Sequence, residues 1–105
     1  MSQKLKLIRN SQIQRILIGA PLEHKHLRAI IELTDDTKLV LHEATLASLV
    51  RAFLTSKFDP LRDAIELVGT ELTVYRTGFA DYQLLDTKKL PDEIKEELTL
   101  TLYQE

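Results

Sequence analysis

The sequence predicts an α+β fold: a mostly antiparallel sheet of four to six strands with two central helices packed on one face. Two observations lead to this class. Apolar and polar residues alternate near both ends and on each side of a turn at 34–37, which is the period of half-buried strands. Between 44 and 68 the apolar period changes to 3.6 residues, which is typical of amphipathic helices. A length of 105 residues favours one domain, 1–105.

Composition excludes several classes of protein. Hydrophobic residues make up 44% of the chain and charged residues 29%, which is ordinary for a globular domain. The absence of cysteine excludes disulfide frameworks, thiol nucleophiles and thiolate metal sites. The longest nearly unbroken apolar run, 16–22, is far shorter than the roughly 20 residues of a membrane helix. Since 1–10 also lacks the apolar core of a signal peptide, we expect a cytoplasmic protein without a membrane segment.

Two hairpins are predicted in the first half of the chain. The alternation in 4–7 and the β-branched residues of 12–18 indicate a first hairpin, although 13–17 would also suit a short helical turn. The apolar runs 26–33 and 38–41 flank a turn-forming cluster and indicate a second. If residue 34 opposes 38, Ile31 opposes Leu41 and Leu33 opposes Leu39, which gives one apolar face.

The helical region divides into two predicted helices. The stripe in 44–57 consists of Leu46, Leu49, Val50, Phe53 and Leu54. Asp59 and Pro60 are typical of a helix start, so a second helix is predicted over 60–68, with Gly69 as its C-cap. With the sheet, these helices would bury a core made of Leu27, Ile31, Leu33, Leu39, Leu41, Leu46, Leu49, Val50, Phe53, Ile65 and Val68.

The C-terminal third is predicted to return to strands. A short strand over 72–75, a turn at 77–78 and a partner in 79–85 would form a hairpin. Pro91 opens a short acidic helix. Residues 98–102 alternate Leu and Thr, which favours a terminal strand; the alternative is one longer helix. A terminal strand could pair with 4–7, Leu beside Leu and Lys beside Glu or Thr.

Charge is unevenly distributed along the chain, although the net charge is only −2. Residues 1–28 carry six basic side chains against one acidic, a balance of +5, so 29–105 has −7. We favour a basic segment lying beside an acidic one over a nucleic-acid-binding face. The candidate contacts for nucleic acid are Lys4, Lys6, Arg15, Lys25 and Arg28, a stretch with no aromatic residue for base stacking.

Motifs for catalysis or metal binding do not emerge. In the proposed register His26 and His42 lie about 13 Å apart, too far for one ion, and His42-Glu43 lacks the second histidine of a zinc protease motif. Three glycines cannot build a phosphate-binding loop. The acidic second helix disfavours a helix-turn-helix DNA reader, and 77–82 is better interpreted as a turn than as a pocket rim. No catalytic residue, metal ligand or cofactor is therefore assigned.

The leading functional hypothesis is a small non-catalytic protein-interaction module that forms a homodimer. Its proposed interface residues are apolar side chains on the polar face of the second hairpin and an exposed terminal strand edge: Ile30, Val40, Leu98, Leu100 and Leu102. The alternative is a nucleic-acid-associated protein that binds through its basic N-terminal sheet. A small enzyme without a recognisable motif comes third.

Overall fold

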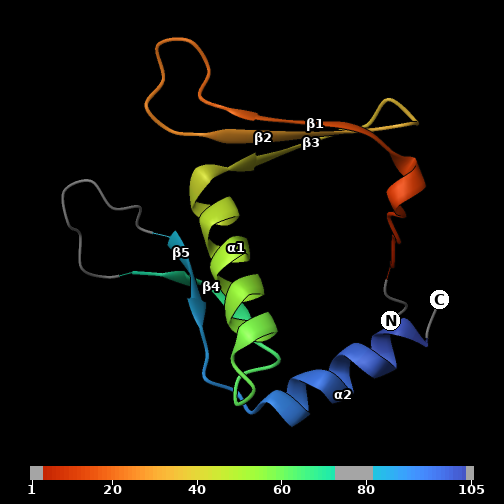
Figure 1. The fold of residues 1–105 in the computed structure, drawn as a ribbon, viewed down its shortest axis with the longest axis vertical. Helices are drawn as coiled ribbons and strands as arrows, with labels where there is room; N and C mark the ends of the chain where they lie inside the picture. Colours follow the sequence, from red (N-terminus) through yellow and green to blue (C-terminus); the bar gives the residue numbers. More distant parts are fainter. Residues whose placement is uncertain (1–3, 73–81, 104–105) are drawn as a thin grey trace. The chain divides into compact units, whose positions relative to one another are not determined.

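The structure, a computed structural model, describes residues 4–72 and 82–103. It confirms an α+β fold but replaces the predicted single sheet with a three-stranded sheet and a two-stranded sheet. The chain divides into two compact units, 1–47 and 48–105. The elements, in chain order, are a 3₁₀ turn (Asn10–Gln12), β1 (Ile13–Gly19), β2 (Arg28–Leu33), β3 (Lys38–His42), α1 (Glu43–Phe58), β4 (Leu67–Glu71), β5 (Tyr82–Asp86) and α2 (Pro91–Leu102) (Figure 1).

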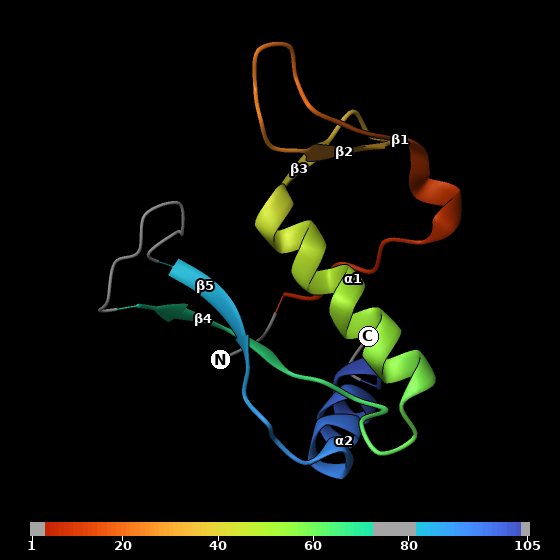
Figure 2. The same ribbon diagram turned by 60° about the vertical axis from the view of Figure 1, so that its left-hand side comes forward.

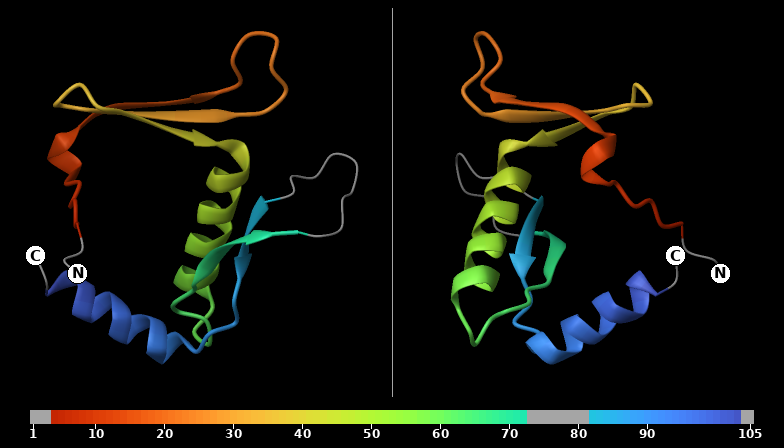
Figure 3. Two further views of the ribbon diagram at one scale, coloured as in Figure 1. Left: turned by 180° about the vertical axis from the view of Figure 1, so that it is seen from behind. Right: turned by 45° about the vertical axis from the view of Figure 1, so that its right-hand side comes forward.

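The sheet of the first unit is antiparallel, with β2 between β1 and β3 (Figures 1 and 3). Because cross-strand partners point to the same side, each row of partners belongs to one face. One face carries the row Ile16–Ile31–Leu39 and the row Ile18–Ala29–Leu41, so it is entirely apolar there. The opposite face mixes apolar and charged rows. The sheet is therefore one-sided, as its alternation predicts.

The register of the β2–β3 hairpin differs from the prediction by two residues. Ile31 opposes Leu39 in place of Leu41. The cause is the turn, which closes between Leu33 and Thr37: the Leu33 N–H donates to the Thr37 carbonyl at 2.9 Å. Asp36 adopts a φ of 69°, so three residues form the loop, a common hairpin geometry. A shift of two residues leaves every side chain on its predicted face.

The predicted hairpin between 4–7 and 12–18 is wrong. Residues 4–9 form no regular element, and β1 pairs with β2. Local hydrogen bonds explain the difference. The Arg9 N–H donates to Gln12 Oε1, and the Gln12 N–H donates to the Arg9 carbonyl, both at 2.9 Å, which closes a 3₁₀ turn. The Gln12 carbonyl then accepts from the Thr34 N–H at 2.9 Å, which places the start of β1 beside the end of β2.

The first predicted helix is confirmed as α1, whereas the second, 60–68, is wrong. Asp59 acts as a turn residue: its Oδ1 accepts from the Leu61 N–H and its carbonyl accepts from the Arg62 N–H. The chain then becomes extended and enters β4. Gly69 lies in this strand opposite Leu84 and is not a helix cap. A Cβ at Gly69 would come within 2.6 Å of the Tyr82 hydroxyl oxygen, so a larger residue there would displace the exposed Tyr82 side chain.

The C-terminal strand prediction is also wrong, and the alternative of one longer helix is correct. α2 begins at Pro91, as predicted, and continues to Leu102. Thr99 is accommodated because its hydroxyl donates to the Lys95 carbonyl one turn earlier, at 2.8 Å. Since neither 4–7 nor 98–102 is a strand, the proposed pairing of the two ends is wrong as well. The predicted strand over 72–75 and turn at 77–78 fall largely outside the described residues; β4 and β5 form an antiparallel hairpin on either side of them.

Buried apolar side chains are few among the described residues: Ala29 and Leu33 in the first unit, Ala64 and Ile94 in the second. Of the predicted core, Leu33 alone is buried. Four members are half-buried, namely Ile31, Leu41, Leu46 and Ile65. The other six are exposed, which corrects the prediction: Leu27, Leu39, Leu49, Val50, Phe53 and Val68. The apolar pattern locates helix and strand faces, but much of that surface remains exposed among the described residues.

Candidate functional site

The most unusual surface of the second unit is the outer side of α1. Leu49, Val50, Phe53 and Leu54 fall on one side of the helix and are 51%, 54%, 64% and 47% exposed. We term these four residues the α1 apolar face. A contiguous group of large exposed aliphatic and aromatic side chains is uncommon on a monomeric protein and typically marks an interaction site.

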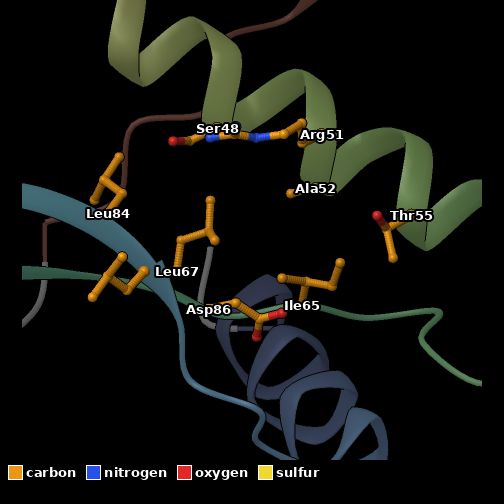
Figure 4. A pocket seen from close by; sticks show the side chains of 9 residues that line it. Ser48, Arg51, Ala52, Thr55, Ile65, Leu67, Leu84 and Asp86 are labelled. Atoms are coloured by element: carbon orange, nitrogen blue, oxygen red, sulfur yellow. The ribbon is translucent and has the colours of Figure 1, made fainter.

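The opposite side of α1 carries small residues that face the β4–β5 hairpin. Ser48, Ala52 and Thr55 follow each other at intervals of four and three residues and therefore lie on one side of the helix. They line a hollow of about 290 Å³ together with Ile65 and Leu67 and with residues of β5 (Figure 4). Ser48 is only 8% exposed. The helix thus turns its small side chains towards its own hairpin and its large ones outward.

The hollow has a charged border at Asp86, the last residue of β5. Both carboxylate oxygens of Asp86 accept from Arg62 Nη2 at 2.9 Å, and Oδ1 also accepts from the Lys88 N–H at 3.0 Å. The Lys88 backbone hydrogen bond, and after it the Arg62 guanidinium, lowers the pKa of Asp86 below its ordinary value of 3.8. Asp86 is therefore a carboxylate at neutral pH and is poorly suited to donate a proton.

This arrangement predicts that stability falls in acid. Because the pKa of Asp86 is lower in the folded protein, its contribution is fully present above about pH 4 and is lost as the pH falls through the folded pKa. Urea unfolding at pH 7 and pH 3 measures the effect. We expect Asp86→Asn to lower the urea midpoint at pH 7. The fall in the midpoint from pH 7 to pH 3 should also be smaller in this variant than in the unaltered chain. An unchanged pH dependence in Asp86→Asn would contradict this role.

The candidate nucleic-acid contacts do not form a free basic surface. Arg15 donates to both carboxylate oxygens of Glu32, at 2.6 and 3.1 Å, and Lys38 lies 3.5 Å from the same carboxylate. Lys6 lies 3.8 Å from Asp35. Arg28 donates to the Leu27 carbonyl. Lys4 and Lys25 form no ion pair with any residue that the structure describes. Two of the five positive charges are thus already paired with carboxylates.

The predicted interface residues lie in two separate places. Ile30 and Val40 are directly opposite each other in the sheet, and Leu17 of β1 extends their row. Val40 is exposed and Ile30 half-buried. Leu98, Leu100 and Leu102 are exposed, but they belong to α2. The strand-edge interface proposed for them is therefore wrong, because a helix satisfies its own backbone groups.

The histidines form a structural contact and no metal centre in the described part of the chain. His26 Nδ1 lies 2.9 Å from Glu43 Oε2, and Glu43 Oε1 accepts from the Leu27 N–H at 3.1 Å. This carboxylate, at the first residue of α1, thereby holds the end of the β1–β2 loop. No group of three or more His, Cys, Asp or Glu side chains that could hold a metal ion occurs among the described residues.

Comparisons with known proteins give no match: no family model fits the chain, and neither a curated protein nor a solved structure is significantly similar to it. Among the described helices, none is both long and apolar enough to cross a membrane. Function must therefore be inferred from the surfaces themselves. Sequence reasoning found the residues of the α1 apolar face but assigned three of them, Leu49, Val50 and Phe53, to the core, and it missed the hollow on the other side of α1.

Proposed function

We propose that this chain is a small non-catalytic protein-interaction module that forms a homodimer through the α1 apolar face. The observation that carries the proposal is the orientation of α1: its large apolar side chains are about half exposed, whereas its small ones face the hairpin. An exposed apolar helix face of this kind is stabilised when another chain covers it.

The size of this face is adequate for a dimer of moderate affinity. Full burial of a large apolar side chain contributes roughly 1.5–3 kcal/mol, so four half-exposed side chains contribute about 3–6 kcal/mol per copy. Two copies therefore gain about 6–12 kcal/mol, against an association cost of roughly 4–15 kcal/mol. At the favourable ends of these ranges the gain exceeds the cost by about 8 kcal/mol, which corresponds to a dissociation constant of about 1 μM and therefore to a dissociable dimer.

Charge at the two ends of α1 favours a second copy as the partner. Glu43 lies in the first turn and Lys57 in the last, four helical turns apart and on nearly the same side. Hydrogen bonds from the Leu27 backbone and from His26 lower the pKa of Glu43, which keeps its carboxylate negative. If two α1 helices pack antiparallel, as two-fold symmetry allows, each Lys57 approaches the Glu43 end of the other copy. A self-complementary face results.

Nucleic-acid binding is the less favoured alternative, because Arg15 and Lys6 already face carboxylates. A titration with mixed oligonucleotides at two salt concentrations distinguishes the two functions, since binding to phosphates weakens steeply with salt. The homodimer predicts no oligonucleotide binding. An enzymatic role has no arrangement of described residues in its favour.

The homodimer is tested by light scattering coupled to size exclusion. At concentrations well above micromolar we expect a mass of twice 12.1 kDa for the unaltered chain and 12.1 kDa for Phe53→Glu, because a buried unpaired carboxylate opposes association. Val40→Glu is the matched control: Val40 is similarly exposed, at 56%, but lies in the sheet. A mass of 12.1 kDa for the unaltered chain contradicts the proposal. Dissociation by Val40→Glu and not by Phe53→Glu would move the interface to the sheet face.

A further inference from the structure

The hollow between α1 and the β4–β5 hairpin has the properties of a ligand site. Its floor is apolar and consists of Ile65, Leu67 and Leu84, whose side chains project towards the helix in Figure 4. Its volume, about 290 Å³, lies at the lower end of the range for small-molecule sites. A water-sized group takes up about 30 Å³, so the hollow accommodates roughly ten non-hydrogen atoms.

Ser48 provides an independent indication that the hollow takes a polar ligand group. This residue is only 8% exposed and lines the hollow, with its hydroxyl on the hollow side of α1 in Figure 4. The Ser48 hydroxyl has no hydrogen-bond partner among the described residues. No fully buried side-chain nitrogen or oxygen lacks a partner among the described residues, so the unpaired Ser48 hydroxyl oxygen keeps access to the open hollow. A ligand oxygen in the hollow would supply that partner.

Charge determines the sign of the ligand. Arg51 lines the same hollow from α1, and it forms no ion pair with any residue that the structure describes. The one carboxylate on the border, Asp86, is already held by Arg62 at 2.9 Å and lies 3.8 Å from Lys88 Nζ. Since Arg62 and Lys88 neutralise Asp86, Arg51 is the lining cation left to pair with an incoming anion.

From these three observations we infer that the hollow binds a small apolar carboxylate. The carboxylate pairs with Arg51 and accepts a hydrogen bond from Ser48, while the hydrocarbon part lies on Ile65, Leu67 and Leu84. A linear eight-carbon carboxylate, with ten non-hydrogen atoms, matches the available volume. This inference does not depend on the homodimer, because the hollow lies on the side of α1 opposite the α1 apolar face.

The test is a titration of the full-length protein with octanoate, followed by amide chemical shifts and by calorimetry. Octan-1-ol and octylammonium are the matched probes, with the same chain but no charge or the opposite charge. We expect octanoate to shift amides in 48–55, 65–67 and 84–86. Octan-1-ol should bind at least tenfold more weakly, and octylammonium should not bind in the hollow.

Two variants test whether octanoate binds in this hollow. Arg51→Gln removes the charge from an exposed position and should weaken octanoate binding roughly 10–100-fold, the range for one charged hydrogen-bonded contact. Ala52→Leu fills the hollow while keeping Arg51, and should abolish binding. Each variant is checked for an unchanged far-UV spectrum. Three results would each overturn the inference. They are no octanoate binding, equal octanoate affinity for Arg51→Gln and the unaltered chain, and amide chemical shifts in the α1 apolar face in place of the hollow.

Discussion

Leu33→Ala is expected to lower the free energy of unfolding by about 2–5 kcal/mol, the cost of removing a large buried aliphatic side chain. Leu33 is 3% exposed and ends β2, where its backbone N–H also closes the hairpin turn. Because so few apolar side chains of the first unit are buried, little remains to compensate for the loss. Urea unfolding followed by far-UV circular dichroism measures the change.

Val40→Ala provides the control for Leu33→Ala. Val40 lies on the neighbouring strand of the same sheet and is 56% exposed, so its truncation should cost less than about 1 kcal/mol. Both variants keep the strand backbone and differ mainly in burial. Similar costs for the two substitutions would show that the burial of Leu33 does not stabilise the first unit.

Ile94→Ala is the second substitution with a large expected effect, about 2–5 kcal/mol on the stability of the second unit. Ile94 is 7% exposed and is the buried residue of α2. The next residue, Lys95, pairs with Asp63, which precedes the buried Ala64. The Lys95–Asp63 pair, next to the buried Ile94, indicates that α2 is held against the segment that follows α1. A short helix of this kind depends on such packing, because its intrinsic stability in water is marginal.

Amide hydrogen exchange across 91–102 measures this effect locally, and Leu98→Ala is the matched control. Leu98 lies on the same helix but is 55% exposed. We expect Ile94→Ala to accelerate exchange throughout α2 and Leu98→Ala to leave it nearly unchanged. Equal protection in both variants would mean that Ile94 does not attach α2 to its unit.

Local signals in the sequence were sufficient for several elements. The 3.6-residue period predicted α1 to within one residue at each end, because that period persists from Leu46 to Leu54. The turn-forming cluster at 34–37 predicted the β2–β3 hairpin, and Pro91 predicted the start of α2. The two-residue register error arose from Asp36, whose positive φ makes a three-residue loop that residue types alone do not specify.

Short segments with mixed signals were decided by tertiary contacts. Asp59 and Pro60 suit a helix start equally well as a turn, and the pairing of β4 with β5 selected the turn and the extended chain after it. The alternating Leu and Thr residues of 98–102 suit a strand, yet they pair with neither β4 nor β5. A helix satisfies its own hydrogen bonds, and Ile94 gives it a buried anchor.

The candidate sites show the same division between sequence and tertiary structure. The amino-acid sequence determined that Leu49, Val50, Phe53 and Leu54 share one side of a helix, since their spacing alone sets their angular positions. Which side of α1 faces the β4–β5 hairpin was decided only by the tertiary structure. The small residues Ser48 and Ala52 took that side, leaving the hollow beside them and the α1 apolar face exposed. Periodicity specifies the direction of a side chain around its helix axis, whereas burial depends on which distant segment, or which other chain, packs against it.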